Sequence, residues 1–98
     1  MSRRLHVTRR AKQDIERIDA WWVQNRQLSA DLFFLELQDA FDMLKRRPTI
    51  GQRYVSRSGS FRRVLLRGTR YHVYYKILPA QVVVTAVWSA VRRRGPVL

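Results

Sequence analysis

The fold is decided by residues 61–88, which read FRRVLLRGTRYHVYYKILPAQVVVTAVW. Two turn signals, Gly68-Thr69 and Pro79-Ala80, divide this stretch into three segments rich in β-branched and aromatic residues. They predict strands over residues 61–67, 71–78 and 81–88, and connections this short make the three strands an antiparallel meander. Because the third strand is almost continuously apolar, we expect it in the interior of the sheet.

Two amphipathic helices are predicted ahead of the meander, over residues 9–26 and 29–46. Thr8 and Ser29 are the expected N-caps, and Pro48 and Gly51 follow the second helix as stop signals. Each helix has apolar residues at helical spacing. These are Ala11, Ile15, Ile18 and Trp22 in the first, and Ala30, Phe33, Phe34, Leu37, Phe41 and Leu44 in the second.

A short opening strand over residues 3–7 and a polar loop over residues 48–60 complete the predicted order, β-α-α-β-β-β. The simplest way to bury both helix stripes is to pack the helical hairpin on one face of the sheet. We therefore expect an α+β fold with a mainly antiparallel sheet of about four strands, forming one domain over residues 1–98.

Charge is distributed very unevenly along the chain. All seven carboxylates lie within residues 1–42, where seven Lys and Arg balance them, and the last 56 residues hold thirteen bases and no acid. The formal net charge of +13 therefore belongs entirely to the C-terminal part of the sequence. Such a surface favours a polyanionic partner, either nucleic acid or an acidic protein. We interpret the carboxylates themselves as solvated helix faces: Asp14, Glu16, Asp19, Glu36, Asp39 and Asp42.

The composition excludes several classes of site. There is no cysteine, and His6 and His72 are far apart with no cluster of metal ligands around them. We expect no metal and no other cofactor. No apolar run approaches the roughly 18 residues of a membrane span, and no signal-peptide pattern follows Met1. The prediction is a cytoplasmic protein with no membrane partner.

Three features could carry function. Strand alternation places Arg63 on the opposite face from Arg62, and His72, Tyr74 and Lys76 on the face away from the helices. Cations interleaved with aromatic rings are typical of RNA or single-strand binding, and an Arg–His pair could support metal-free RNA cleavage. A solvated face with half-buried tyrosines remains an equal alternative. The second feature is the arginine triplet at residues 92–94. It could bind a phosphate or the carboxylates of an antitoxin, or it could be a solvated tail. The third is Trp21, which marks an interface if it is exposed.

A set of short motifs runs along almost the whole chain, at residues 7–15 with Trp21-Trp22, and at residues 44–51, 62–66, 71–75, 87–92 and 96–98. In their order and spacing these motifs resemble the ParE/RelE superfamily of bacterial type II toxins. The resemblance implies a growth-inhibiting toxin that a cognate acidic antitoxin neutralises in a hetero-oligomer.

Two branches of that superfamily make different predictions. RelE-like members cleave mRNA on the ribosome, and by position their strand arginine, later arginine and tyrosine fall at His72, Arg92 and Leu98. Leu98 can neither stack on a base nor exchange a proton. ParE-like members, which are similar to this chain in the Trp pair and the Pro-x-Leu ending, are associated with poisoning DNA gyrase.

We favour the ParE-like branch, acting by protein binding and not as an enzyme. The expected antitoxin- or target-binding residues are Arg63, Arg67, Arg70, Tyr74, Lys76, Arg92, Arg93, Arg94 and Trp21. The alternatives are an mRNA endonuclease using Arg62, Arg63, His72 and Arg92, and a non-toxic basic module that binds nucleic acid.

Overall fold

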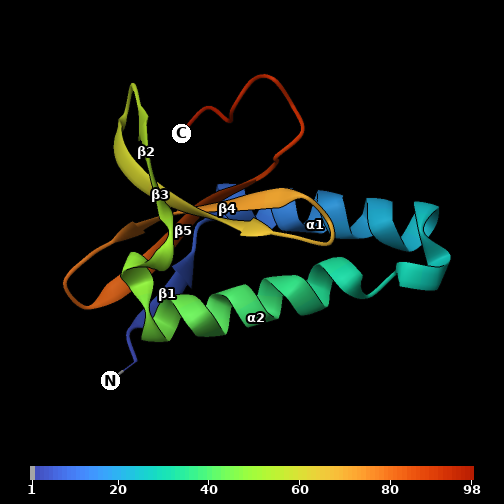
Figure 1. Cartoon of the computed structure of the whole chain (residues 1–98), viewed down its shortest axis with the longest axis horizontal. Helices are drawn as coiled ribbons and strands as arrows, with labels where there is room; N and C mark the ends of the chain where they lie inside the picture. Colours follow the sequence, from blue (N-terminus) through green and yellow to red (C-terminus); the bar gives the residue numbers. More distant parts are fainter. Residues whose placement is uncertain (1) are drawn as a thin grey trace.

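The computed structural model describes residues 2–98 and has a five-stranded sheet packed against two helices (Figure 1). The sheet order is β1-β5-β4-β3-β2, with β1 parallel to β5 and all other pairs antiparallel. The elements are β1 (Arg4–Val7), α1 (Arg9–Asn25), α2 (Leu32–Arg46), β2 (Gln52–Ser56), β3 (Gly59–Leu66), β4 (Tyr71–Ile77) and β5 (Gln81–Ser89). Short 3-10 helices occupy Gln27–Ser29 and Pro48–Ile50. The predicted fold class, α+β with a helical hairpin on a mainly antiparallel sheet, is confirmed.

The core lies between the sheet and the two helices. Phe33, Leu37 and Leu44 of α2 face the sheet, and Ala11 and Ile18 do so from α1. The core residues of the three central strands alternate along each strand, except between Val84 and Val87, where the β4–β5 register shifts. They are Val64, Leu66, Val73, Tyr75, Val82, Val84 and Val87. The strand with the most continuous apolar run, β5, lies between β1 and β4, in the interior position expected for it.

The predicted loop over residues 48–60 was wrong, because it contains β2. This strand pairs with β3 as a tight hairpin, from Gln52↔Arg63 to Ser56↔Gly59, and Gly59 adopts a φ of 130° at the turn. The strand is at the sheet edge, and Gln52, Arg53 and Val55 are exposed. Polar and charged residues are common on edge strands because they discourage pairing with other chains, so the composition resembled that of a loop.

The predicted start of the second helix was also wrong by three residues. Residues 27–29 form a 3-10 turn in which the Ser29 amide donates to the Arg26 carbonyl at 2.9 Å, so Ser29 is no N-cap. The α-helical hydrogen bonds begin where the Leu35 amide donates to the Asp31 carbonyl, at 3.0 Å. Thr8, in contrast, caps α1 as expected, since its hydroxyl accepts from the Ala11 amide at 3.1 Å.

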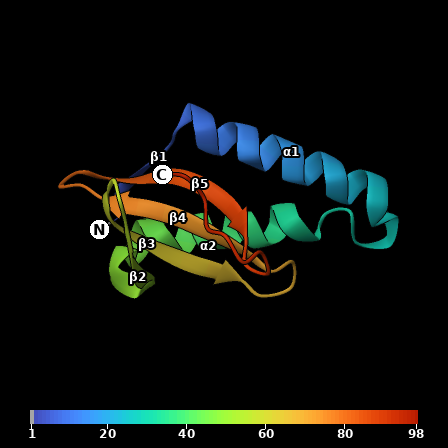
Figure 2. The ribbon, with the colours of Figure 1, turned by 90° about the horizontal axis from the view of Figure 1, so that it is seen from above.

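The C-terminal tail (residues 90–98) does not extend into solvent. After β5 it turns back and crosses the sheet on the face opposite α2, as Figures 1 and 2 both show. Pro96 is buried in this position. The molecule therefore has three layers at this point: helix, sheet and tail.

Candidate functional site: a basic, aromatic sheet face

The two faces of the sheet separate apolar from basic residues as the alternation predicts. Val64, Val73 and Tyr75 are buried towards the helices. Arg63 pairs with Tyr74 across β3 and β4, Leu65 pairs with His72, and these side chains lie on the other face. We call Tyr54, Arg63, His72, Tyr74 and Lys76 the basic stripe.

Cations and aromatic rings are packed together within the basic stripe. The Arg63 guanidinium lies 4.9 Å from the ring centroid of Tyr54 and donates to the Tyr74 hydroxyl at 3.2 Å. The Tyr54 and Tyr74 rings meet edge to face at 5.0 Å. At one end, the Lys76 ammonium lies 4.5 Å from the centroid of the Phe61 ring. Cation–π contacts of this kind hold the charges in place on the sheet.

His72 belongs to the stripe but is not positively charged near neutral pH. Burial lowers its pKa below the ordinary value of 6.5, and the charge of Arg63 lowers the pKa further. Its ring lies 6.0 Å from that of Tyr74. His72 therefore contributes a neutral imidazole, and the positive charge of the stripe comes from Arg63 and Lys76.

The tail covers the middle of the stripe, so the expectation of an open face was partly wrong. Tyr74 lies on the predicted face, yet only 2% of its surface is exposed. The tail is held by its own carbonyl groups, which accept hydrogen bonds from three side chains. Arg10 donates to Val97 at 2.6 Å, Ser58 to Leu98 at 2.5 Å and Trp88 to Arg94 at 2.8 Å.

The remaining predicted arginines are exposed but lie in two other places. Arg67 and Arg70 occupy the turn between β3 and β4, where Arg70 has a φ of 67°. Arg92, Arg93 and Arg94 are exposed in the tail. The structure thus groups the predicted residues into the stripe, the β3–β4 turn and the tail, and does not bring all of them into one pocket.

Trp21 and Arg92 lie together at a separate place, beside α1. Trp21 is 44% exposed, and both residues line a cavity of about 300 Å³ with Arg17 and Trp88. The Arg92 guanidinium lies 5.0 Å from the centroid of the Trp88 ring. The exposure of Trp21 meets the condition under which the sequence indicated an interface.

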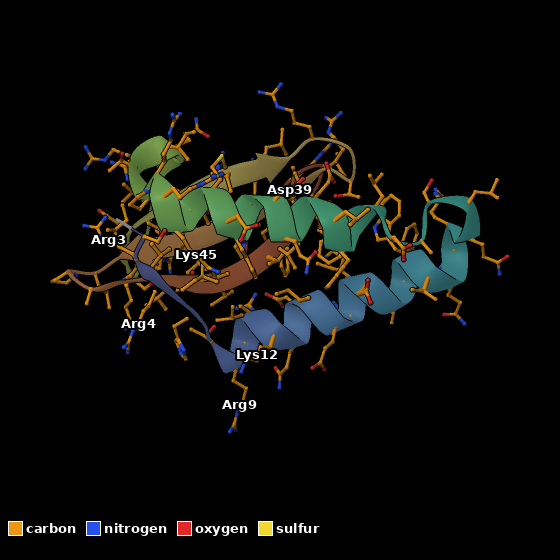
Figure 3. The ribbon with its side chains drawn as sticks, turned by 90° about the horizontal axis from the view of Figure 1, so that it is seen from below. Arg3, Arg4, Arg9, Lys12, Asp39 and Lys45 are labelled. Atoms are coloured by element: carbon orange, nitrogen blue, oxygen red, sulfur yellow. The ribbon has the colours of Figure 1, made fainter. Side chains whose placement is uncertain are left out.

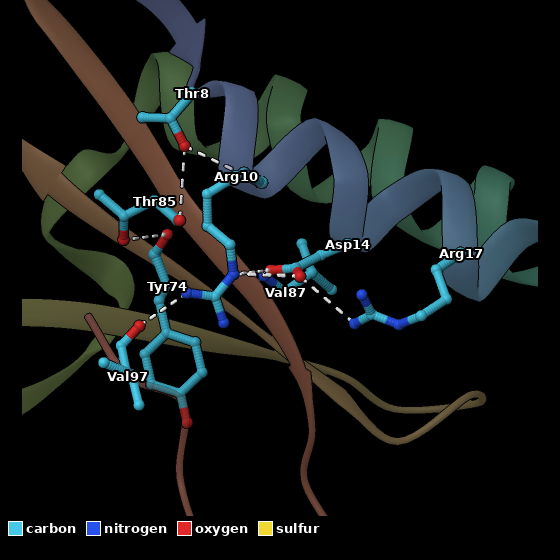
Figure 4. A network of polar contacts seen from close by, with 9 residues as sticks. Thr8, Arg10, Asp14, Arg17, Tyr74, Thr85, Val87 and Val97 are labelled. Atoms are coloured by element: carbon cyan, nitrogen blue, oxygen red, sulfur yellow. Dashed lines mark hydrogen bonds and ion pairs between the residues drawn. The ribbon is translucent and has the colours of Figure 1, made fainter.

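Two carboxylates expected to be solvated are instead structural. Asp14 is 2% exposed and accepts hydrogen bonds from Arg10, Arg17 and the Val87 amide (Figure 4). Glu36 accepts from the Gly68 and Thr69 amides, at 2.6 and 2.9 Å, and from the Thr69 hydroxyl. The hydrogen bonds of Asp14 link α1 to β5, and those of Glu36 link α2 to the β3–β4 turn.

A signal for Asp14 was present in the sequence. Residues 11, 14, 15 and 18 follow the spacing of one helix face, so Asp14 lies inside the apolar stripe of α1. An acid in that position is stable only if it is paired, and Arg10 and Arg17 stand four residues before it and three after it. Glu36 gives no comparable signal, because its partners lie in a distant turn.

Comparison with known families agrees with this geometry. The family described as "ParE toxin of type II toxin-antitoxin system, parDE" matches residues 5–94. The chain belongs to the ParE toxin family. A solved structure of the chromosomal ParDE TA system from P. aeruginosa has the same fold, with a TM-score of 0.71 at 16% identity, over 90% of this chain and 96% of that one. No curated protein sequence matches.

The residues of the nuclease alternative are not assembled in this ParE-family chain. Arg62 lies on the opposite face of β3 from Arg63, and its guanidinium donates to the Thr49 and Gly51 carbonyls at 3.2 and 2.8 Å. Arg92 lies beside Trp88, on the cavity near α1. Only Arg63 and His72 of that set share the stripe.

A further group of cations lies on the helix side of this ParE-family fold (Figure 3). Arg3 and Arg4 lie at the start of β1, with Arg3 beside Lys45 in the last turn of α2, and Arg9 and Lys12 lie in the first turn of α1. The Arg3 amide donates to the Lys45 carbonyl at 2.9 Å. Four of the seven N-terminal bases therefore lie around β1 and the start of α1.

Two negative findings complete the description of residues 2–98. Within that range no helix is long and apolar enough to cross a bilayer. The same residues contain no group of three or more His, Cys, Asp or Glu able to hold a metal ion.

Proposed function

We propose that this chain is a toxin that acts by binding a protein target, DNA gyrase, and that a cognate acidic antitoxin keeps it inactive. The observation that carries the proposal is the charge of the molecule: +13, with the thirteen bases of residues 43–98 unaccompanied by any acid. Unbalanced arginines on an ordered surface favour an acidic partner, because its carboxylates neutralise positive charges that repel one another within the free chain. Membership of the ParE family supports the same partner.

The β3–β4 turn and the edge of β3 are the proposed antitoxin surface. β2 pairs with β3 only as far as Gln52↔Arg63, so within the described residues no strand covers the outer edge of residues 64–66. Two cavities beside this edge share Met43, Leu65 and Arg67. Glu36 and Asp39 line one of these cavities, so a bound extended segment would fill the cavities with apolar side chains and place its acidic side chains at Arg67 and Arg70.

Binding, and not RNA cleavage, is the mode of action that the geometry supports. Cleavage requires general acid–base groups around one phosphate. In this chain Arg62 donates to backbone carbonyls, His72 is half-buried with a lowered pKa, and the Leu98 side chain has no titratable group. Protein binding needs only the exposed arginines and aromatic side chains, which are enriched at interfaces.

The test is induced expression with and without the adjacent gene, which the proposal expects to encode the antitoxin. We expect growth arrest without that gene, rescue with it, and loss of supercoiling when purified chain is added to gyrase. Gyrase that remains fully active at stoichiometric excess of the chain would show that the target is wrong. Codon-phased cuts in mRNA from arrested cells would establish the nuclease alternative instead, and normal growth at high expression would favour the non-toxic module.

The antitoxin surface has its own test with a matched control. Replacing Arg67 and Arg70 by Gln should weaken antitoxin binding at least tenfold, since both lie beside the proposed edge. Replacing Arg9 and Lys12 by Gln removes the same charge from the helix side and should have a much smaller effect. Equal losses of antitoxin affinity in the two variants would mean that binding depends only on the overall charge of the chain.

A further inference from the structure

The cavity beside α1 is distinct from the β3 edge and from the basic stripe. It has a volume of about 300 Å³ and lies between α1 and the end of β5. Ile18 and Trp21 of α1 form one wall, and Val87 and Trp88 of β5 contribute to the other. Two guanidinium groups, of Arg17 and Arg92, belong to its lining. Its size is at the lower limit of pockets that bind small ligands, so it suits one or two side chains.

The positive charge of this cavity is only partly neutralised within residues 2–98. Arg17 forms an ion pair with Asp14 at 3.3 Å, but the two oxygens of Asp14 also accept from Arg10 twice and from the Val87 amide. A carboxylate has about four acceptor positions, so Asp14 is saturated. Arg17 uses a single nitrogen in that network, and Arg92 is in no ion pair within the described range. Both arginines retain donors for an external anion.

The Trp88 ring is fixed in place, and cations already lie against it. Its indole nitrogen donates to the Arg94 carbonyl at 2.8 Å. Its ring centroid lies 5.0 Å from the Arg92 guanidinium and 5.9 Å from that of Arg10. A nucleobase would have to displace one of these cations to stack on Trp88, whereas a side-chain carboxylate can approach Arg92 without disturbing the ring.

We infer that this cavity is an anchor for a partner protein, and that it takes a Glu or Asp side chain next to an aromatic or branched apolar one. The carboxylate would bind Arg17 and Arg92, and the apolar side chain would pack on Trp21 and Ile18. Tryptophan and arginine around a small pocket are the composition of an interface hot spot. The inference rests on the proposed function for its partner, a protein, and specifies the chemistry that this partner presents.

The test uses a defined probe, so that neither an antitoxin nor gyrase is needed. The ¹⁵N-labelled chain, made by cell-free synthesis, is titrated with N-acetyl-Glu-Phe-amide while the three tryptophan indole signals are followed by NMR. We expect saturable shifts of the Trp21 and Trp88 signals at millimolar probe. The backbone amide signals of β2, at the far edge of the sheet and outside the cavity, serve as the internal reference. The isosteric N-acetyl-Gln-Phe-amide should bind at least tenfold more weakly.

Two variants locate the site. Arg92→Gln should weaken probe binding at least fivefold, and because Arg92 is exposed and unpaired with any acid, this variant keeps its fold. Arg17→Gln together with Arg92→Gln should abolish binding. Arg57→Gln together with Arg93→Gln removes the same charge from outside the cavity and should leave binding unchanged.

The inference is overturned if the Glu and Gln probes bind equally, if the two double variants lose binding equally, or if AMP shifts the same signals at lower concentration than the peptide. If the Glu probe does not bind but the chain still binds its antitoxin, the anchor is refuted and the proposed function stands. Probe binding by a chain that neither arrests growth nor binds an antitoxin would refute the proposed function alone.

Discussion

Asp14 shows how much one buried charge contributes to the arrangement of this fold. It is the largest departure from the expected solvated carboxylates, since it joins α1 to the backbone of β5 through the Val87 amide at 3.1 Å. We expect Asp14→Ala to lower the free energy of unfolding by about 2–4 kcal/mol, because it leaves a buried amide without an acceptor and two arginines without their partner. Urea denaturation followed by circular dichroism measures the change.

Glu16→Ala is the matched control for that experiment. Glu16 is an exposed acid on the same helix, two residues away. Its replacement should change the free energy of unfolding by no more than about 0.5 kcal/mol. A similar loss of unfolding free energy in both variants would mean that helix propensity or net charge, and not the buried hydrogen bonds of Asp14, determines the stability change.

Tyr75 is the second residue whose polar group is buried for a structural purpose. Its hydroxyl donates to the Pro48 carbonyl at 2.6 Å and accepts from the Gly51 amide at 2.9 Å. Burial raises the pKa of Tyr75 above 10.0, although the Gly51 hydrogen bond and the charge of Arg62 oppose the shift, so the phenol stays protonated and able to donate. Tyr75→Phe should cost about 1–3 kcal/mol of unfolding free energy, measured by urea denaturation, because both backbone groups lose their partner.

The environment of His72 predicts how the stability of the fold changes with pH. Burial, and then Arg63, lower its pKa below 6.5, so the unfolded chain binds this proton more readily than the folded chain. The stability that His72 contributes is complete above about pH 6.5 and is lost as the pH falls through the lowered pKa. His72→Gln should therefore reduce the fall in urea midpoint between pH 7.5 and 5. His6→Gln, at an exposed position, should not.

At the scale of elements, what could be predicted depended on local periodicity. α1, β4 and β5 have strong helical or strand patterns and clear boundary residues, and the structure places them within a residue or so of the predicted bounds. β2 and the start of α2 were missed because both depend on tertiary context. Gln52, Arg53 and Val55 form a strand only because β3 is beside them, and Ser29 could not be distinguished from an N-cap by composition.

The candidate site, too, could be predicted where it depended on local alternation and could not where it depended on tertiary context. Alternation along β3 and β4 was sufficient to place Arg63, His72, Tyr74 and Lys76 on one face. The burial of Tyr74 could not be predicted, because it depends on a tail with no regular secondary structure whose attachments are backbone carbonyls. Side-chain patterns contain no information about where a carbonyl group will find its donor.

Gly95 provides a test of the attachment of the tail. A Cβ at this position would lie 2.5 Å from the Tyr54 hydroxyl, and Tyr54 is held by Tyr74 and Arg63. Gly95→Val should therefore displace the tail and loosen the backbone around the already exposed Arg92, Arg93 and Arg94, so that trypsin cleaves after them several times faster. Val97→Ala, at a side chain that is 85% exposed, should leave the rate of cleavage unchanged.

At the scale of the whole molecule, the separation of charge differs in space from that in sequence. The first 42 residues are neutral along the chain, yet four of their seven bases, at positions 3, 4, 9 and 12, lie around β1 and the first turn of α1, with Arg3 beside Lys45 (Figure 3). The tip of the helical hairpin, residues 20–30, contains a single charged residue, Arg26. Positive charge therefore surrounds the sheet, while the hairpin tip is close to neutral.

This distribution predicts how salt affects the free chain. A formal charge of +13 on 98 residues repels itself in the folded state, where the charges are closest together. Raising the salt concentration from 0.01 to 0.1 M shortens the Debye length from about 30 to about 10 Å, so the repulsion is screened. We expect the Tm of the isolated chain to rise over that range. Few ion pairs oppose the effect, because three are present among residues 2–98 and Asp14 is in two of them.

A charge variant separates this effect from nonspecific salt effects. Replacing Arg53, Arg57 and Arg93, all exposed and outside the helices, by Glu lowers the formal charge by six. The increase in Tm with salt should then be clearly smaller, and the Tm at 0.01 M salt should be higher than that of the parent chain. Scanning calorimetry at both salt concentrations measures the two quantities. A Tm that falls with salt in the parent chain would mean that local ion pairs outweigh the net repulsion, and the acid-free sheet would then need no acidic partner to be stable.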